Sequence, residues 1–326
     1  MQFPQGAFSK KDILITGGTG FIGSNLVREL IKENANIFVG IRKSSDLWRL
    51  ENIKNKINLL EIDLQNKEKV NRLIQSFNPH YIFHFALPSY LRLKNAFDYH
   101  NQLNQTTGNL INLLNAVNQY STNLNSFVHA CSSTIYKWEK NHYYLSEKTS
   151  LDPATFRGML KLNERNICRH FARKNKIPIK IGRIFRAYGP WDTSQKLIVT
   201  ALNSIKTGNP MPLSNDRFKR DYIFIDDLIQ GFLKMAVSHI PTGSEINFGS
   251  GKQYNAGEII KTLEEILDQN ALIATSEYPE NPYDRGNFIA DISLAKQKLG
   301  WQPKFSVKEG LKCTVDWYKN YFKWNL

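Results

Sequence analysis

Three glycines, Gly17, Gly20 and Gly23, stand at G-x-x-G-x-x-G spacing in the segment ITGGTGFIG. The segment follows a short apolar run and opens a helical pattern, which predicts a tight turn between a strand and a helix. Glycine lets such a turn approach a pyrophosphate closely, and the helix N-terminus presents N–H groups and partial positive charge to the phosphates. The turn therefore predicts a dinucleotide site that also includes Phe21 and Ile22. A glycine-rich turn without a ligand is the alternative.

Strands and helices are expected to alternate around this turn over roughly the first half of the chain. Strands are predicted at 12–16, 36–41, 57–64, 81–87, 126–132 and 177–185, and helices after the glycine turn and at 67–77, 108–120 and 160–176. Such alternation is typical of the α/β class with a doubly wound parallel sheet, the Rossmann arrangement.

The alternation loosens after about residue 188, where proline and glycine cluster. Helices are expected near 256–268, 293–299 and 306–321, within a smaller C-terminal α+β substrate lobe. We therefore expect a dinucleotide-binding domain over 1–185 that also receives part of 222–250. Residues 186–326 are expected to form mainly the substrate-binding lobe.

The glycine turn resembles the dinucleotide loop of extended short-chain dehydrogenases/reductases, the superfamily of NAD(P)-dependent sugar-nucleotide epimerases, dehydratases and reductases. Other motifs follow in the order typical of this family: EIDL, FHFAL, SSTIY, RIFRAYGP, KRDYIFIDDL, NFGSGK and ADISLAKQKLGWQPKFSVKEGL. The resemblance covers nearly the whole chain. It implies that Asp63 and Leu64 border the adenine, and that Ala86 and Leu87 lie along the cofactor.

The resemblance also implies hydride transfer at a sugar carbon, with a hydroxyl, a tyrosine phenolate and a lysine as catalytic groups. Ser132 occupies the hydroxyl position, although a serine that merely caps a strand end is the alternative, and Lys161 occupies the lysine position, where it would hold ribose hydroxyls. The tyrosine position holds Arg157, which stays protonated and can only stabilise negative charge. Tyr144, which has Lys148 four residues later, is an alternative phenol on the preceding loop.

The substrate side carries unusual arginines. Arg186 stands where the family usually has asparagine beside the sugar, and together with Arg157 it favours an anionic or enlarged substrate. Arg220 and Arg285 match positions where family members contact the phosphates of a nucleoside-diphosphate sugar, and paired guanidiniums suit a diphosphate. Ser133 is a further substrate-binding candidate. A site that has drifted after losing its function is the alternative.

The segment SSTIYK has no carboxylic acid between Ser132 and Tyr136, where dehydratases of the family place one. Elimination of water is therefore disfavoured. The segment resembles the corresponding element of GDP-fucose synthases, which favours 4-keto-sugar reduction or epimerisation.

The cofactor is expected to be NADP, with NAD as the alternative. Counted from Gly17, the acidic residue that grips the ribose in NAD sites falls at about Ile41, where no carboxylate stands. Arg42 and Ser44 follow instead, and a guanidinium with hydroxyls suits a 2′-phosphate. A solvated basic loop would explain the same residues without a phosphate.

A basic stripe recurs every four residues over 157–173. We expect a solvated helix face, which makes nucleic acid an unlikely partner, but the net charge of +14 keeps open a catalytically weak protein that binds RNA or another polyanion. A protein that binds NADP(H) without turnover is a third reading. The stripe consists of Arg157, Lys161, Arg165, Arg169 and Arg173.

Several further expectations concern the cysteines, the location, the N-terminal residues and the assembly of the protein. The three cysteines lack metal-ligand spacing, so we expect reduced core residues and no metal site. Reduced cysteines favour a cytoplasmic location. No apolar run is long enough to span a membrane, and the N-terminal residues lack the apolar stretch of a signal peptide. The N-terminal residues are expected to form a short tail before the first strand. The family resemblance implies a homodimer through helices like 104–120 and 160–175.

Overall fold

The computed structural model describes residues 4, 6–87, 96–137, 144–192, 196–213, 218–274 and 288–323. Its contacts divide the chain into two compact units. Unit 1 comprises residues 1–135, 155–183 and 229–246, and unit 2 comprises 136–154, 184–228 and 247–326. The chain therefore passes between the units several times.

The framework of unit 1 is a seven-stranded sheet in the order β10-β7-β5-β4-β1-β2-β3. Neighbouring strands from β3 to β5 pair in parallel. The predicted doubly wound α/β sheet is thus confirmed. Its strands are β1 (Asp12–Thr16), β2 (Asn36–Ile41), β3 (Asn58–Glu61), β4 (Tyr81–His84), β5 (Ser126–Ser132), β7 (Ile179–Ile184) and β10 (Ser244–Phe248), whose last residues belong to unit 2.

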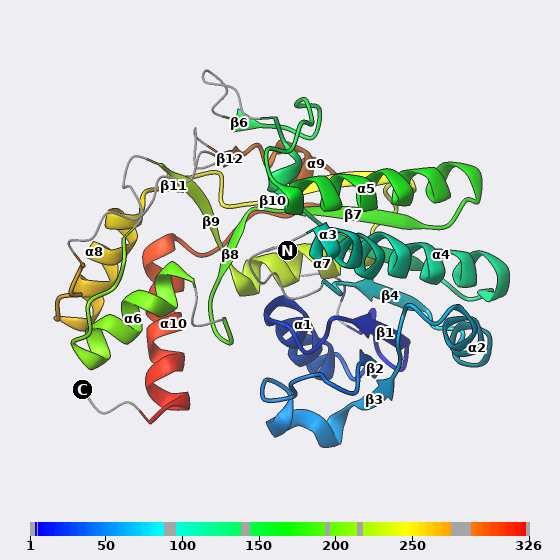
Figure 1. The fold of residues 1–326 in the computed structure, drawn as a ribbon, viewed down its shortest axis with the longest axis horizontal. Helices are drawn as coiled ribbons and strands as arrows, with labels where there is room; N and C mark the ends of the chain where they lie inside the picture. The colour runs from blue at the N-terminus through cyan, green and yellow to red at the C-terminus, as the bar shows by residue number, and fades with distance from the viewer. Residues whose placement is uncertain are drawn as a thin grey trace. The chain divides into compact units, whose positions relative to one another are not determined.

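Helices cover both faces of this sheet (Figure 1). The strand order reverses after β3, and right-handed crossovers then place α1 on one face and α2, α4 and α5 on the other. On the first face, Gln230 of α7 donates a hydrogen bond to Glu29 of α1 at 3.0 Å. The helices are α1 (Phe21–Lys32), α2 (Lys67–Phe77), α3 (Ala96–Leu103), α4 (Asn109–Tyr120), α5 (Phe156–Lys174) and α7 (Ile225–Val237).

The segment before β1 is more than the expected tail. Phe8 is fully buried, and its ring packs against Tyr81 and Phe83 of β4 at centroid distances of 5.0 and 6.5 Å. The expectation of a simple tail is therefore wrong for this part of the segment, because one aromatic side chain anchors it to the core.

Unit 2 contains two small sheets and four helices among its described residues. One sheet has the order β11-β9-β8, and the other pairs β12 with β6. The elements are β6 (Tyr144–Leu145), β8 (Arg186–Tyr188), β9 (Arg220–Phe224), β11 (Gln253–Tyr254), β12 (Ile289–Ala290), α6 (Leu197–Thr207), α8 (Ala256–Leu267), α9 (Ser293–Leu299) and α10 (Val307–Tyr321), with the start of α7.

Several boundaries differ from the sequence-based expectation. The helix expected from residue 160 starts at Phe156, because the Thr155 side chain accepts a hydrogen bond from the Gly158 N–H at 3.0 Å and caps the helix. The strands expected at 57–64 and 81–87 end at Glu61 and His84, where the chain leaves the sheet edge. A π-helical turn at Asn104–Gly108 precedes α4.

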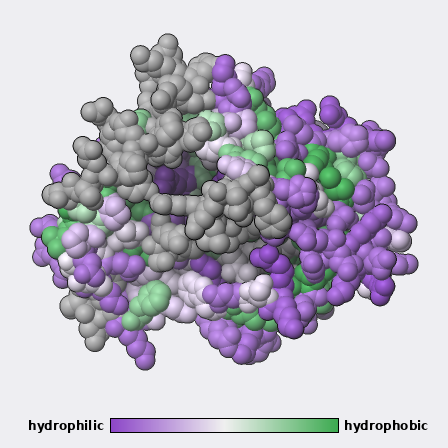
Figure 2. Space-filling model, viewed as in Figure 1, coloured by the Kyte–Doolittle hydropathy of each residue, from purple (hydrophilic) through white to green (hydrophobic). Residues whose placement is uncertain are grey.

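Among the described residues, no helix is both long enough and apolar enough to span a bilayer. On the face drawn in Figure 2, most of the coloured surface is hydrophilic and the hydrophobic residues occur in small groups. Cys131 and Cys168 are buried free thiols, as expected, but Cys313 is exposed. The expectation of a core position is wrong for Cys313, which lies on the outer side of α10.

Candidate active site

The glycine turn lies where the strand order of the sheet switches, at the carboxyl end of β1 beside β4. Gly17 has φ +77°, and a Cβ placed on it would lie 2.5 Å from the backbone carbon of Phe85. A Cβ on Gly23 would lie 2.2 Å from the Gly17 carbonyl oxygen. The turn is therefore packed so tightly that two of its positions admit only glycine.

The start of α1 offers backbone donors to a ligand. Gly20 is the N-cap residue and has no side chain to satisfy the first N–H groups, and the first turn of the helix has no acidic residue. Phe21 and Gly23 are buried and Ile22 is half-buried in this first turn. The residues present fit a pyrophosphate, because the backbone N–H groups of a helix N-terminus and the helix dipole favour an anion there.

Arg49 adds positive charge beside the turn, and sequence analysis missed it. Its guanidinium donates a hydrogen bond to the Thr19 carbonyl oxygen at 3.4 Å, although 30 residues separate them. The backbone of Arg49 is held in turn by Arg28 of α1, whose Nη2 donates to the Arg49 carbonyl at 2.6 Å. No motif spacing reveals this arginine, since it follows an irregular segment after β2.

The predicted 2′-phosphate residues follow β2 in a closed turn. Arg42 and Ser45 exchange two hydrogen bonds, from the Arg42 N–H to Ser45 Oγ at 2.8 Å and from the Ser45 N–H to the Arg42 carbonyl at 2.9 Å. The side chains of Arg42 and Ser44 are exposed. Asp46, the first carboxylate after the strand, accepts a hydrogen bond from the Trp48 N–H at 3.0 Å. This bond engages one oxygen of the Asp46 carboxylate with the local backbone.

The remaining cofactor candidates lie at the carboxyl ends of neighbouring strands. Asp63 and Leu64 follow β3, and Asn112 of α4 donates to the Leu64 carbonyl at 2.9 Å. Ala86 and Leu87 follow β4 and are half-buried. In a parallel sheet these ends meet at one edge, so unit 1 brings the glycine turn and these four residues to the same edge.

Ser132 ends β5 at the same edge, and its hydroxyl is set up as a donor. Its Oγ accepts hydrogen bonds from the Thr134 N–H at 3.2 Å and the Thr134 hydroxyl at 3.0 Å. A serine oxygen that accepts two bonds still has its own O–H to give. Ser132 can therefore donate to an oxygen of a bound sugar, and half-buried Ser133 follows it in a short 3₁₀ turn.

Lys161 is buried in α5, with 5 % of its surface exposed. Its ammonium donates to the Ala130 carbonyl oxygen of β5 at 2.9 Å and pairs with Glu164 at 2.8 Å. Arg157 lies about one turn earlier in α5 and is exposed. Lys161 thus belongs to the interior of unit 1, whereas Arg157 lies at its surface.

Two histidines line the buried end of this site. Thr16 Oγ1 and His84 Nδ1 are 2.7 Å apart, the rings of His84 and His129 stack at 5.7 Å, and His129 Nε2 lies 3.7 Å from Glu164. Burial, followed by the charge of Lys161, lowers the pKa of His84 to about 3 and moves that of His129 in the same direction. Both rings are therefore neutral at physiological pH.

These histidines predict a specific acid sensitivity. Because the pKa of His84 is lower in the folded chain than in the unfolded one, it stabilises the fold above pH 6.5 and loses this contribution as the pH falls toward 3. At pH 3.5 we expect a loss of roughly 4 kcal/mol from His84. Urea unfolding between pH 7 and 3.5 measures it. His84→Asn is expected to flatten the profile, and the exposed His170→Asn control is expected to leave it unchanged.

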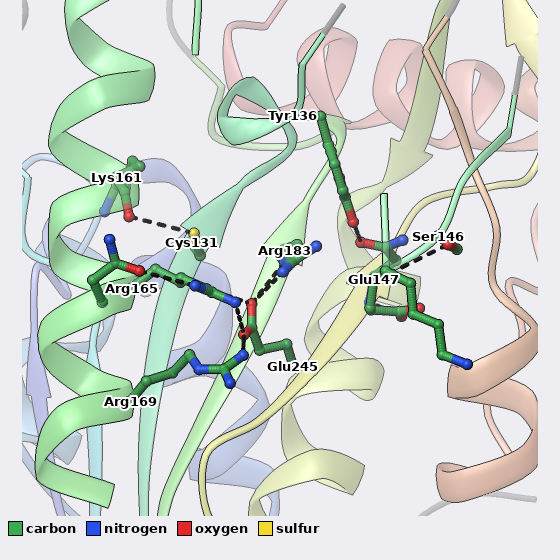
Figure 3. A network of polar contacts seen from close by, with 12 residues as sticks. Cys131, Tyr136, Ser146, Glu147, Lys161, Arg165, Arg169, Arg183 and Glu245 are labelled. Atoms are coloured by element: carbon green, nitrogen blue, oxygen red, sulfur yellow. Dashed lines mark hydrogen bonds and ion pairs between the residues drawn. The ribbon is translucent and has the colours of Figure 1, made fainter. Parts of the chain in front are cut away.

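The basic stripe of α5 is not a solvated face. Arg165 binds Glu245 of β10 through two bonds at 2.6 and 3.0 Å, and Arg169 binds the same carboxylate at 2.7 Å (Figure 3). Arg183 of β7 completes the cluster and is fully buried. Burial acts to raise the pKa of Glu245, but the hydrogen bonds and charges of Arg165, Arg183 and Arg169 hold it below its ordinary value. The expectation of a solvated stripe is wrong, because a carboxylate distant in sequence faces its centre.

Unit 2 carries the remaining candidates. Arg186 of β8 is in register with Tyr222 of β9, and its guanidinium lies 5.5 Å from the Tyr222 ring. Arg220 lies two residues before Tyr222 and so points to the same face of this small sheet. Tyr144 stands in β6 with 66 % of its surface exposed. Arg285 lies outside the described residues.

A buried carboxylate that sequence analysis missed organises this unit. Asp221 accepts hydrogen bonds from the Ser250, Gly251 and Ala290 N–H groups and from the Ser250 hydroxyl, at 2.6 to 3.0 Å. Burial raises its pKa to about 6, against these bonds. Asp227 similarly accepts hydrogen bonds from the Lys304 and Phe305 N–H groups, which gives this carboxylate a structural role.

A family model described as GDP-mannose 4,6 dehydratase matches residues 14–314. The chain belongs to this family. The predicted membership of the sugar-nucleotide branch of extended short-chain dehydrogenases/reductases is thereby confirmed, as are the fold class and the prediction of an enzyme.

Individual relatives of this GDP-mannose dehydratase family member agree. A UDP-glucuronate 4-epimerase of Thermodesulfobacterium geofontis is 30 % identical over 325 residues, covering 94 % of this chain and 95 % of that one. The crystal structure of a UDP-glucuronic acid 4-epimerase from Bacillus cereus with UDP-glucuronic acid and NAD is 25 % identical, with a TM-score of 0.82 over 95 % of this chain and 99 % of that one. A UDP-glucose 4-epimerase of Thermotoga maritima, 24 % identical, shares the fold with a TM-score of 0.87 over 95 % and 99 %.

These relatives support a nicotinamide dinucleotide as the cofactor class and a nucleoside-diphosphate sugar as the substrate class of the family. In this family member, unit 1 brings together the glycine turn, the residues after β2, β3 and β4, Ser132 and Lys161. Among the described candidates, Arg186, Arg220 and Tyr144 belong to unit 2.

Proposed function

We propose that this protein is a sugar-nucleotide 4-epimerase or 4-keto-reductase that acts on an acidic nucleoside-diphosphate sugar. The observation that carries the proposal is the Ser132 hydroxyl, free to donate at the sheet edge that also carries the glycine turn. A hydroxyl there can polarise a sugar oxygen during oxidation or reduction of its carbon. When bound, the nicotinamide cofactor supplies the hydride acceptor and donor.

We propose that residues 1–185, with part of 222–250, hold the dinucleotide and that 186–326 mainly hold the sugar nucleotide. The turn residues support the first assignment because their backbone donors fit a pyrophosphate. Arg220 supports the assignment of 186–326 to the sugar nucleotide. It is half-buried and lies on the same face of the small sheet as the exposed Arg186. We retain Arg285 as a phosphate ligand by its position in the sequence motif, and Ser133 as a contact to the sugar.

Arg157 and Arg186 support an acidic sugar. A carboxylate on the sugar ring can accept two parallel hydrogen bonds from a guanidinium, which neutral sugars cannot match. The names of the relatives from Thermodesulfobacterium geofontis and Bacillus cereus point to the same substrate type, a uronic acid. Since arginine cannot exchange a proton, we assign Arg157 to charge stabilisation and retain Tyr144 as the alternative phenol.

The acidic-sugar proposal predicts a discrimination by charge. We expect UDP-glucuronate to bind at least tenfold more tightly than UDP-glucose, and Arg186→Ala to remove most of this preference. Calorimetric titration of both ligands measures it. Lys219→Ala is the matched control, because Lys219 is a neighbouring cation paired with Glu258 at 3.5 Å, and it is expected to leave the ratio unchanged. Equal affinity for the two ligands would contradict the proposal.

For the cofactor we propose NADP, although the Bacillus cereus structure contains NAD. Exposed Arg42 and Ser44 support a 2′-phosphate, and no carboxylate stands at the end of β2, where NAD sites place one. Arg42→Ala is expected to weaken NADPH binding by about tenfold, or ~1.4 kcal/mol, and to leave NADH binding within twofold. Fluorescence titration measures both; Lys43→Ala is the control. Tighter binding of NADH by the unaltered protein would overturn this assignment.

A polyanion-binding function loses its main support. Lys161, Arg165 and Arg169 of the stripe are engaged with carboxylates, which leaves Arg157 and Arg173 exposed.

We also propose a homodimer through α4 and α5. The supporting observation is that α5 exposes Met159, an apolar side chain.

A further inference from the structure

Lys161 and Glu164 form a buried ion pair within α5. Glu164 is fully buried, and its Oε2 lies 2.8 Å from the Lys161 ammonium. Three residues separate the two along the helix, so they share one face, the face that packs on β5. The second partner of the ammonium, the Ala130 carbonyl oxygen, belongs to that strand.

The pair constrains the lysine side chain. Side chains on a helix lean toward its N-terminus, so the Glu164 side chain reaches back toward Lys161. An ammonium has three N–H groups, and the Ala130 carbonyl oxygen accepts one of them, whereas Glu164 is an ion-pair partner. Within the described part of the chain, no third group contacts the ammonium.

Glu164 is the carboxyl that this lysine faces. Burial raises the pKa of Glu164, and the positive charge of Lys161 acts against this rise. The neighbouring titratable groups are His84 on β4, His129 and Cys131 on β5, Cys168 on α5, Arg183 on β7 and Glu245 on β10. Both histidines are neutral, and burial raises the pKa of Cys131 to about 11 and that of Cys168 further in the same direction. Glu245 already faces three arginines.

We propose that Glu164 is a positioning residue, which supplies the counter-charge that holds the Lys161 ammonium at Ala130 and leaves one N–H for a ligand hydroxyl. The identity of the ligand rests on the proposed function. If that function is right, the hydroxyl belongs to the ribose of the dinucleotide. Without a nearby carboxylate, a buried lysine favours its neutral amine form. Lys161 would then lose the charge that holds its nitrogen at the Ala130 carbonyl.

The first test needs no ligand and uses urea unfolding of the full chain between pH 6 and 9. Glu164→Gln is expected to raise the equilibrium constant for unfolding at least tenfold at pH 6. This loss of stability is expected to shrink toward pH 9, where the neutral amine needs no counter-charge. In a Lys161→Met background, the same substitution is expected to show no such pH dependence. Burial lowers the pKa of Lys180 to about 8, so this residue also makes stability depend on pH. The comparison of the two backgrounds cancels its contribution. A loss that is independent of pH and equal in both backgrounds would overturn the proposal.

The second test follows NADPH and NADH affinity over the same pH range. For the unaltered protein we expect dissociation constants that stay within threefold. For Glu164→Gln we expect at least tenfold weaker binding at pH 9 than at pH 6, and Glu164→Asp, which keeps the charge, is expected to restore much of the flat profile. A flat profile for Glu164→Gln would refute the role in ligand binding.

The two tests separate the inference from the proposed function. If the unaltered protein binds neither dinucleotide while the unfolding experiment shows the background-dependent pH effect, the proposed function fails and the positioning role of Glu164 stands. If the dinucleotides bind and Glu164→Gln behaves as the unaltered protein does in both tests, the positioning role fails and the proposed function stands.

Discussion

Replacing Gly17 with alanine is expected to abolish dinucleotide binding, with affinity reduced at least 100-fold. The new Cβ would lie 2.5 Å from the Phe85 backbone carbon and 2.6 Å from the Ala86 nitrogen, and φ at this residue is +77°. The turn must move away from β4 to admit the methyl group, which displaces the N–H groups that face the phosphates. Left-handed backbone strain and overpacking together are expected to cost roughly 2–4 kcal/mol of folding stability.

Gly208→Ala is the matched control for this experiment. Gly208 also has a positive φ, +67°, but a Cβ there would meet nothing within 4 Å. Its strain alone is expected to cost about 1 kcal/mol without changing dinucleotide affinity. Fluorescence titration with NADPH and urea unfolding measure both effects. A folded Gly17→Ala protein that binds dinucleotide with unaltered affinity would refute the placement of the pyrophosphate at this turn.

Ser132→Ala is expected to lower kcat about 100- to 1000-fold on a keto-sugar nucleotide. The Ser132 oxygen accepts two hydrogen bonds from Thr134, so its O–H is the group left to polarise the sugar oxygen. Single-turnover absorbance of the nicotinamide measures the hydride step directly. Dinucleotide affinity is expected to stay within threefold, because the turn after β1 is untouched.

Ser133→Ala controls for the loss of a neighbouring hydroxyl. Ser133 is half-buried like Ser132 but lies one residue later, in the 3₁₀ turn Ser133–Ile135. We expect it to change KM by a few-fold and to leave the hydride step within about fivefold. Equal rate losses in the two variants, or a Ser132→Ala rate within threefold of the unaltered one, would contradict the role given to Ser132.

The fold could be predicted where local patterns carry it. β1, the glycine turn and α1 follow from an apolar run, a turn that only glycine fits and helical spacing. α6 and α7 were not predicted. In α7 the polar residues Asp226, Asp227, Gln230 and Lys234 recur at helical spacing between buried apolar ones, so the period that identifies an amphipathic helix is present and could have predicted it.

The site could be predicted only as far as motifs reach. The order of the strands brings the motif residues of unit 1 to one sheet edge, as the resemblance implied. The charge balance could not be predicted, because it depends on tertiary contacts. Glu245 neutralises Arg165 from 80 residues away, and no spacing along α5 indicates this carboxylate. Arg49 was missed for the same reason.

The most direct test of this account is a titration of the purified, folded protein with NADPH and NADH, followed by nicotinamide fluorescence. If the backbone donors at the start of α1 hold a pyrophosphate, at least one of the two must bind with a dissociation constant in the micromolar range or below. If neither NADPH nor NADH binds at millimolar concentration, the glycine turn is not a nucleotide site, and the proposed oxidoreductase chemistry is contradicted as well.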